Sequence, residues 1–308
     1  MKYILKLVLI IISFTFCLET TANNIPQKTV PDKVFTPLTI PEEVWTKIPE
    51  DIDFIGHADG TRLPILLMKR KIKQELKKYD FLRGLKYYEI ANKYYLFGSA
   101  KHGYCGLLIH SSNLEAQKIF HVLTTRIKTK HDIKINGRYA VWAKEKLVFY
   151  LYSENLLLIS FGEKDLKKFT AEKPSPIFKE LSSTHIASAY CKSNLVKIPL
   201  IRDYVLTIPE LYEFKEARMF FQLLPFSVNS EFVFSSQKKA ENISSAFENI
   251  IKEIAVKYPD FPSAINRSIC KETIKLSVST EFFSAVKKIA KDPELRKLFQ
   301  NKITIKNR

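Results

Sequence analysis

Glycine is scarce in this 308-residue chain, with only eight in total, and that scarcity excludes several common functional devices. The sequence contains no P-loop, no G-x-G-x-x-G, no G-x-S-x-G and no H-E-x-x-H. The glycine-rich motifs among these cradle phosphates or present a nucleophile on a tight turn, and the last one binds zinc from a helix. The sequence therefore gives no support to the commonest phosphate-binding and nucleophile-elbow enzymes.

Long apolar runs are missing as well, since a membrane-spanning helix needs roughly 20 consecutive apolar residues. The N-terminus instead has a positive start, a short apolar run and a small-residue site, namely Lys2 and Lys6, Leu7–Phe16, and Thr20-Thr21-Ala22. This order is typical of a secretory signal peptide. We expect residues 1–22 to be removed by cleavage after Ala22, which predicts a secreted or periplasmic protein. Cys17 offers lipid attachment as an alternative, although Phe16 stands where a lipobox has a small residue.

Acidic residues are outnumbered, 32 Asp and Glu against 49 Lys and Arg, so the formal charge is +17. This imbalance suggests an anionic partner, and cell-wall polymers, lipid headgroups, acidic polysaccharide and nucleic acid all qualify by charge. A predicted amphipathic helix carries one candidate basic face, Lys69, Arg70, Lys71 and Lys73. Its apolar stripe is equally what core packing requires, so lysines that only solvate helix faces are the alternative. Tyrosine pairs such as Tyr94-Tyr95 follow strand periodicity, which disfavours nucleic-acid binding by base stacking.

The body of the chain reads twice. Residues 94–113 align without a gap on residues 219–238, each with an apolar run, a polar turn, a second apolar run and an amphipathic helix. Residues 54–63 likewise correspond to 186–195. The pattern predicts an α+β fold made by tandem duplication of a mostly antiparallel unit with pseudo-symmetric halves. Whether the copies form two domains or share one sheet stays open.

The predicted organisation follows from this repeat and from the prolines. After the signal peptide come a proline-rich leader at 23–44, a first copy at 45–174, a second copy at 175–298 and a basic tail at 299–308. The first copy is expected to end in a meander that includes an Asn136-Gly137 turn, which favours a two-residue type I′ hairpin. The second copy has lost part of this meander.

Cysteine is rare, and no C-x-x-C occurs, so a thioredoxin-like or zinc-ribbon site is unsupported. Cys105, Cys191 and Cys270 remain after signal cleavage. An odd number permits one disulfide and one free thiol in an oxidising compartment. We expect Cys191 to pair with Cys270, because both lie on predicted strands of the second copy. The alternative is three buried thiols that act as small apolar residues.

The most suggestive catalytic candidates are His57 and Asp59, since residues two apart on a strand share a face. An imidazole beside a carboxylate could orient a general base or begin a metal site. Ala189 and Cys191 stand at the aligned positions of the second copy, so the fold does not demand the pair. His102 and His110 flank Cys105, but a surface turn and an edge strand explain these three residues better than a nucleophile. The histidines show no metal-ligand spacing, and we expect no cofactor.

The opening Pro49-Glu50-Asp51-Ile52-Asp53-Phe54-Ile55, together with the two copies, resembles exported bacterial proteins built from two degenerate α+β repeats. The resemblance covers most of residues 45–295 and rests on pattern. It implies the fold but brings no chemistry with it. The leading hypothesis is a non-enzymatic binding protein for an anionic or amphipathic envelope partner. A hydrolase with a site around His57 and Asp59 is the alternative, and a structural envelope component is the third.

Overall fold

The computed structural model describes residues 35–62, 92–99, 101–111, 115–128, 132–143, 146–161, 166–192, 214–223, 226–279 and 281–282. The predicted signal peptide, the basic face Lys69, Arg70, Lys71 and Lys73, and the tail at 299–308 lie outside the described residues. None of the described helices is long and apolar enough to cross a membrane.

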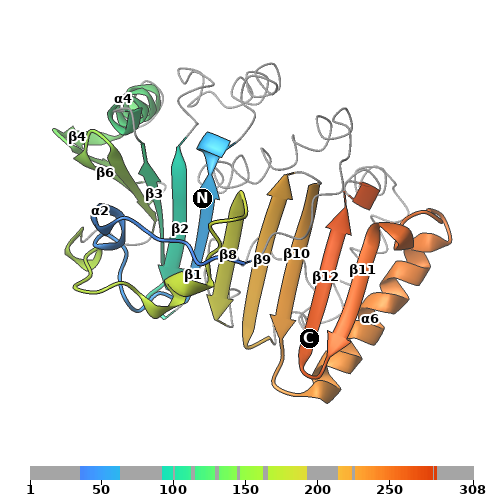
Figure 1. The fold of residues 1–308 in the computed structure, drawn as a ribbon. Coiled ribbons are helices and arrows are strands. Elements are labelled where there is room, and N and C mark those ends of the chain that lie inside the picture. Colours follow the sequence, from blue (N-terminus) through green and yellow to red (C-terminus); the bar gives the residue numbers. More distant parts are fainter. Residues whose placement is uncertain are drawn as a thin grey trace, which may run out of the picture.

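Twelve strands form one antiparallel sheet, in the order β11-β12-β10-β9-β8-β1-β2-β3-β7-β6-β5-β4. Figure 1 shows them side by side across the whole molecule. Their bounds are β1 Phe54–Asp59, β2 Lys93–Ser99, β3 Tyr104–His110, β4 Lys134–Asn136, β5 Tyr139–Trp142, β6 Leu147–Ser153, β7 Leu156–Phe161, β8 Ala187–Lys192, β9 Glu216–Leu223, β10 Phe226–Val233, β11 Ile265–Cys270 and β12 Thr273–Ser279. Mixed helices and a large antiparallel sheet agree with the predicted α+β class.

The described residues also form α-helices and 3₁₀ turns beside the sheet. They are α2 Glu42–Trp45, α4 Glu115–Lys128 and α6 Gln237–Ala255, with 3₁₀ turns η1 Gly60–Arg62, η5 Leu166–Lys168, η6 Pro176–Glu180 and η9 Pro262–Ala264. The α6 helix begins at Ser236, whose hydroxyl accepts a hydrogen bond from the Lys239 amide, and this satisfies one of the free donors of the first turn. α4 lies at one end of the sheet and α6 at the other (Figure 1).

Two hydrophobic cores lie on opposite faces of the sheet. In the first core, the apolar stripe of α4, which includes Phe120 and Leu123, packs on alternate residues of β3, β6 and β7. The second core covers the other face of β1, β2, β3 and β7 with residues 40–52 and 169–181. β7 is buried along its whole length, because it lies between these cores. That explains why its sequence, LLLISF, is apolar except for the buried Ser160 and does not alternate.

The two predicted copies meet at a strand pair that we call the seam. β1 pairs with β8 in antiparallel register, with Phe54 opposite Cys191 and His57 opposite Ser188. Outward from the seam, each side continues with a hairpin, β2-β3 or β9-β10, and then with β7 or β12. The two predicted copies therefore lie in one continuous sheet, joined by backbone hydrogen bonds.

The second hairpin differs from the gap-free alignment on which the repeat was first seen. Leu96 pairs with Leu107 in the first hairpin, but Phe221 pairs with Val228 in the second, where the alignment requires Phe232. The first hairpin has a four-residue connection at 100–103, whereas only residues 224 and 225 separate β9 from β10. The second connection is also centred two residues earlier than the alignment places it. This shifts the register by four residues, an even number, so each side chain keeps the face that the alignment predicted.

The Asn136-Gly137 turn lies one residue later than expected. Asn136 pairs with Tyr139 as the last residue of β4, so Gly137 and Arg138 form the loop. Gly137 has a φ of 55°. Among the described non-glycine residues, positive φ occurs at Lys146 and Lys271, so the φ of Arg138 is negative. A glycine at the first loop position with an ordinary residue at the second is the pattern of a type II′ turn, not type I′.

The predicted leader also extends too far. Residues 35–44 are part of the folded body, because Pro37 forms a β-bridge with Ser182 and the Leu38 amide donates to the Leu181 carbonyl. Val44 is fully buried in the second core. Proline density suggested an extended spacer, and the segment is indeed extended at first, but its apolar residues pack against the sheet.

Candidate functional site

His57 and Asp59 lie on the same face of β1, as the strand pattern predicts, but they do not form a hydrogen-bonded pair. Asp59 accepts hydrogen bonds from the amide and the hydroxyl of Thr61. Both ring nitrogens of His57 are buried without a hydrogen-bond partner. The Asp59 carboxylate therefore holds the turn after β1. It does not orient the His57 imidazole, as the third residue of a catalytic triad orients the base.

The surroundings of His57 keep it uncharged. The side chain is only 4% exposed, its ring centroid lies 5.1 Å from that of Tyr95 on β2, and Ser188 of β8 stands on its other side. Burial lowers the pKa of His57 from 6.5 to about 4; Asp59 opposes the shift, whereas Lys93 and Arg62 add to it. A neutral imidazole has the right protonation state for a base at neutral pH, but here it is enclosed at the seam.

A second buried histidine lies near the seam and was not singled out from the sequence. His185 Nδ1 is 2.6 Å from the Ser182 hydroxyl, and the Ser188 hydroxyl accepts a hydrogen bond from the Ser182 amide. The Arg62 guanidinium donates to three consecutive backbone carbonyls, those of residues 183 to 185. Ser182 is fully buried, and the Arg62 guanidinium binds the loop that follows it. These contacts fix the loop against β8, and the Ser182 hydroxyl is not exposed as a nucleophile.

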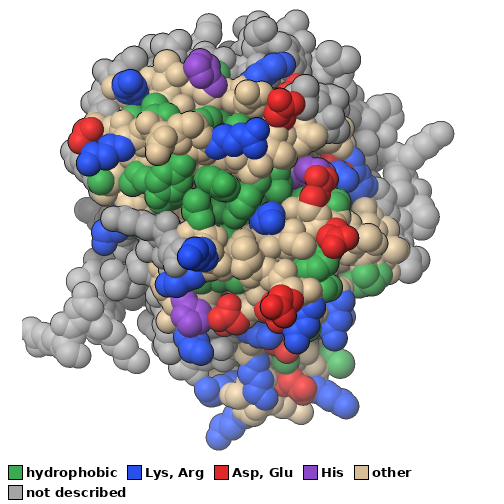
Figure 2. Space-filling view, turned by 90° about the vertical axis from the view of Figure 1, so that its left-hand side faces the viewer, with side chains coloured by type: hydrophobic (Ala, Val, Ile, Leu, Met, Phe, Trp, Pro, Cys, Tyr) green, Lys and Arg blue, Asp and Glu red, His purple; other side chains and the backbone are tan. Residues whose placement is uncertain are grey.

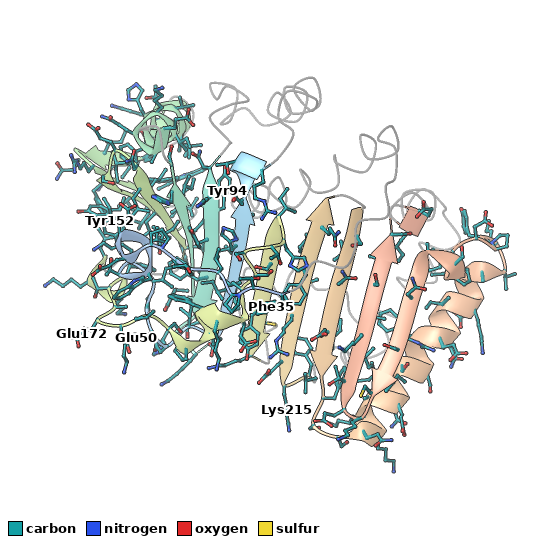
Figure 3. All side chains as sticks on the ribbon, viewed as in Figure 1. Phe35, Glu50, Tyr94, Tyr152, Glu172 and Lys215 are labelled. Carbon is teal, nitrogen blue, oxygen red and sulfur yellow. The ribbon has the colours of Figure 1, made fainter. Side chains whose placement is uncertain are left out.

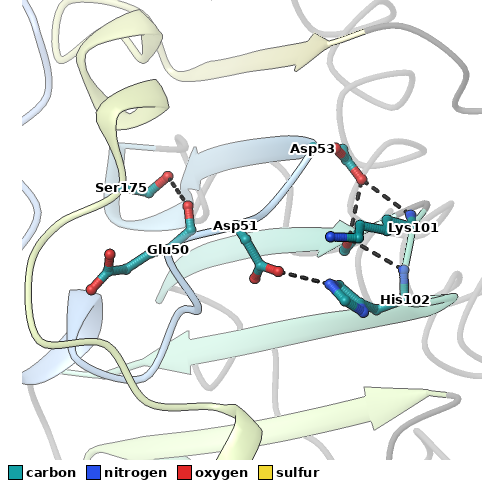
Figure 4. A network of polar contacts seen from close by, with 7 residues as sticks. Glu50, Asp51, Asp53, Lys101, His102 and Ser175 are labelled. Carbon is teal, nitrogen blue, oxygen red and sulfur yellow. Dashed lines mark hydrogen bonds and ion pairs between the residues drawn. The ribbon is translucent and has the colours of Figure 1, made fainter.

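The acidic opening motif has a structural explanation, which Figure 4 shows. Asp53 accepts hydrogen bonds from the Ser99 hydroxyl and the Lys101 amide, and the Asp51 carboxylate lies 2.8 Å from His102 Nε2. Glu50 similarly accepts from the amides of residues 172 and 173. Each carboxylate thus fastens a neighbouring loop, so the motif positions the β2-β3 turn and the residues that precede η6.

The predicted Cys191–Cys270 disulfide is wrong. Cys105, Cys191 and Cys270 are all free thiols. β8 and β11 are separated by β9, β10 and β12, a distance of roughly 19 Å at the usual strand spacing, whereas a disulfide needs Cα atoms within about 7 Å. The placement of Cys105 on an edge strand is wrong too, since β3 pairs with both β2 and β7.

The outer end of the sheet carries a set of half-buried aromatic residues that the sequence reasoning missed. Tyr139 of β5 and Tyr150 and Tyr152 of β6 lie on the face opposite α4, with Val141 beside them. All four are half-buried. We call these four residues the tyrosine patch. Figure 2 shows a hydrophobic band across this side of the molecule, and Figure 3 places Tyr152 there.

The rings of the tyrosine patch stand edge to face. The centroids of Tyr139 and Tyr150 are 6.4 Å apart at an interplanar angle of 63°, and those of Tyr150 and Tyr152 are 4.7 Å apart at 86°. The Tyr152 hydroxyl donates to the Phe169 carbonyl, so this ring is fixed at the border of the second core. Burial raises the pKa of Tyr152, with a smaller contribution from Tyr150. Trp45 and Leu166 pack against the same core.

Positive charge adjoins the tyrosine patch. The Lys47 ammonium lies 5.3 Å from the centre of the Tyr152 ring, and the Arg138 guanidinium donates to the Tyr152 carbonyl. Lys134 pairs with Val141 across β4 and β5, and η5 contributes Lys167 and Lys168. β4, β5, β6 and η5 contain no Asp or Glu. We call Lys47, Lys134, Arg138, Lys167 and Lys168 the basic rim.

The corresponding face at the other end of the sheet carries ion pairs. Arg218 of β9 forms its shortest ion pair with Glu180, at 2.8 Å, and lies 3.6 Å and 3.8 Å from Glu216 and Glu231. Lys275 adds an ion pair to Glu231 at 2.9 Å. Two cations here face three carboxylates, so this cluster offers no excess of positive charge.

Within the described ranges, no group of three or more His, Cys, Asp or Glu could hold a metal ion. No family model matches the sequence, and neither does any curated protein. Among solved structures, crystal form III of TP0453 is similar at 9% identity, covering 83% of this chain and 99% of that one, with a TM-score of 0.49. Crystal form IV of TP0453 gives 10% identity, 82% and 96% coverage and a TM-score of 0.43. Similarity at this level says nothing about chemistry.

Proposed function

We propose that this chain is an exported, non-enzymatic binding protein for an anionic or amphipathic partner in the cell envelope. The observation that carries the proposal is the tyrosine patch with its basic rim. A partly exposed aromatic surface on a folded chain is typical of an interaction site. Basic residues beside it favour partners of negative charge and speed their encounter. The N-terminal signal pattern supports the envelope as the location.

Nothing in the seam favours the hydrolase alternative. His57 has the protonation state of a base but no orienting carboxylate, and Asp59 is bound to Thr61. Double replacement of both residues by alanine, assayed across a broad substrate screen, tests this directly. An activity present in the wild type and lost in the variant, at an unchanged melting temperature, would favour the hydrolase.

The proposed function is tested by retention of the mature protein on anionic lipid, cell-wall and heparin supports under a salt gradient. A rim variant replaces Lys47, Lys134, Lys167 and Lys168 by glutamine. Its control replaces the exposed Lys179, Lys192, Lys215 and Lys238, so the net charge changes equally. We expect the rim variant to elute at lower salt than the control, because contact charges count for more than total charge. Absence of salt-dependent wild-type retention on all supports would refute the proposal.

The basic face predicted from the sequence gives a third variant for the same columns, with Lys69, Arg70, Lys71 and Lys73 replaced by glutamine. If this variant loses retention and the rim variant does not, the partner binds the predicted helix and the tyrosine patch is not the site. Loss in the rim variant alone assigns binding to the outer end of the sheet.

We also propose that the fold is a tandem duplication with copies at 45–174 and 175–298. The support is the strand order, which continues on each side of the seam with a hairpin and then the strand that follows the helix. A circular permutant that begins at Ser175, with the original ends of the mature chain joined, tests it. Equivalent units joined at the seam predict a urea midpoint close to that of the wild type, and a permutant that does not fold contradicts the proposal.

A further inference from the structure

The arrangement of the rings narrows the chemistry of the partner. A polymer that binds by stacking, such as a sugar chain or single-stranded nucleic acid, needs ring faces that lie open and parallel to the binding surface. In the tyrosine patch the rings of Tyr150 and Tyr152 stand edge to face at 86°, and the Lys47 ammonium lies over the Tyr152 ring. The rings therefore do not lie parallel to one common surface, and the aliphatic Val141 lies beside them. Such a surface does not suit stacking.

The same arrangement suits the boundary between water and lipid. Tyrosine and tryptophan are enriched at membrane interfaces, because each ring has an apolar body and one polar group. Basic residues near the surface add attraction to anionic headgroups, about a 5-fold gain in affinity for each Lys or Arg. The basic rim places Lys47, Lys134 and Arg138 beside the tyrosine patch, and η5 adds Lys167 and Lys168. β4, β5, β6 and η5 carry no carboxylate, whereas the segment of Lys47 also carries Glu42, Glu43 and Glu50.

We propose that the tyrosine patch is a peripheral membrane-binding surface that lies against anionic phospholipid. This inference rests on the proposed function and names the partner class for the same site. The sheet docks by its outer end, with β5 and β6 toward the headgroups, the ammonium groups of Lys47 and Lys134 at the phosphates, and Tyr139 and Tyr150 at the level of the glycerol. The apolar area is small, so neutral membranes bind weakly and anionic lipid is required.

Trp45 provides a probe that needs no label. The chain has two tryptophans; Trp142 is buried in the first core, and Trp45 is half-buried against the second core, like Tyr150 and Tyr152. The mature protein is titrated with vesicles of brominated phosphatidylcholine containing phosphatidylglycerol, and with vesicles of brominated phosphatidylcholine alone. We expect half-maximal quenching of the wild type at a lipid concentration at least about 10-fold lower with the phosphatidylglycerol vesicles than with the neutral ones. Trp45→Phe should show no quenching.

Variants assign the contact to the patch. Tyr139→Ser with Tyr150→Ser should weaken vesicle binding about 10-fold or more, measured by co-sedimentation. The matched control is Phe35→Ser with Met219→Ser, which removes two exposed large apolar residues elsewhere, 43% and 36% exposed, and should bind like the wild type. Urea midpoints establish that both doubles are folded. If the tyrosine double unfolds, Tyr150→Gln alone, read by quenching at matched folded concentration, replaces it.

The outcomes separate the two proposals. Retention on heparin or cell wall without quenching by phosphatidylglycerol vesicles overturns the lipid assignment and leaves the proposed function standing. Vesicle binding that the tyrosine double does not weaken overturns the patch as the membrane surface. Equal binding to neutral vesicles overturns the role of the basic rim. Absence of retention on every anionic support overturns both proposals.

Discussion

Replacement of His57 by leucine should make the protein lose much less stability in mild acid than the wild type loses. The imidazole is buried without hydrogen-bond partners, and its pKa is about 4 in the folded state against 6.5 as the ordinary value. In the folded chain the ring stays neutral, whereas in the unfolded chain it takes up a proton below pH 6.5. Stability from this group is therefore complete above pH 6.5 and is lost as the pH falls toward 4.

The magnitude follows from the difference in pKa. At pH 4.5 the His57 ring is protonated in the unfolded chain, because the pH lies about 2 units below its ordinary pKa of 6.5, whereas the ring in the folded chain is mostly neutral. Each pH unit of this difference stabilises the unfolded chain by about 1.4 kcal/mol. Between pH 7 and pH 4.5 the His57 contribution therefore falls by about 2–3 kcal/mol. At pH 7 the leucine variant should be equal to the wild type or about 1 kcal/mol more stable, since an unpaired polar group leaves the interior.

The assay is urea unfolding at pH 7, 6, 5 and 4.5, followed by tryptophan fluorescence. The control is His121→Leu, at an exposed position of α4, which should retain the acid sensitivity of the wild type. Carboxylates titrate alike in all three proteins, so the difference between variants isolates His57. A leucine variant that loses as much stability in acid as the wild type would show that His57 is solvated or paired, and would refute the reasoning.

Three further outcomes test the packing and the thiols. Val44→Ala should cost about 2 kcal/mol in urea unfolding, because Val44 is fully buried and loses two carbon groups to a cavity, whereas Val256→Ala, at 89% exposure, should change stability by less than about 0.5 kcal/mol; equal effects would remove residues 35–44 from the core. Gly98→Ala should cost about 1–3 kcal/mol, since its methyl would lie 2.5 Å from the Phe54 ring and 2.6 Å from the Tyr104 carbonyl, while Gly56→Ala, with its nearest neighbour at 3.7 Å, should fall well below that; the reverse order would contradict the β1-β2-β3 packing. A thiol reagent should modify Cys270 in the native protein and reach Cys105 and Cys191 only on unfolding, because both are buried and burial raises the pKa of each to about 12; fewer than three thiols in the unfolded mature protein would indicate a disulfide.

The elements that depend on local sequence patterns could be predicted from the sequence. The apolar run, polar turn and second apolar run of residues 94–113 predicted the hairpin of β2 and β3, and the amphipathic helix expected after it is α4. These elements depend on periodicity over a few residues, which the sequence displays directly. Register is different, because it depends on loop length and on which strand is the neighbour, and neither the β9-β10 slip nor the seam has a local signal.

The candidate site was harder to predict, for a related reason. His57 and Asp59 share a face as expected, but Thr61 competes for the carboxylate, and that competition appears only when the turn is folded. The tyrosine patch did leave a signal. Tyr150 and Tyr152 alternate with Phe149 and Leu151, so both faces of β6 are apolar or aromatic, and an outer strand has no reason to bury both. The position of β6 near the outer end of the sheet, which the sequence does not give, leaves the tyrosine face only half-buried.

The seam between β1 and β8 also has a consequence for how the chain reaches its structure. Phe54 and Cys191 are opposite each other although they lie 137 positions apart, so their pairing closes a very long loop. Such closure is slow, since its entropy is lost before the contact is gained. Until β8 arrives, β1 is an unprotected strand edge that can pair with another chain. Pairing of β1 with β8 is thus the folding step at which a chaperone, or a low concentration of chains, has most effect on the yield of folded protein.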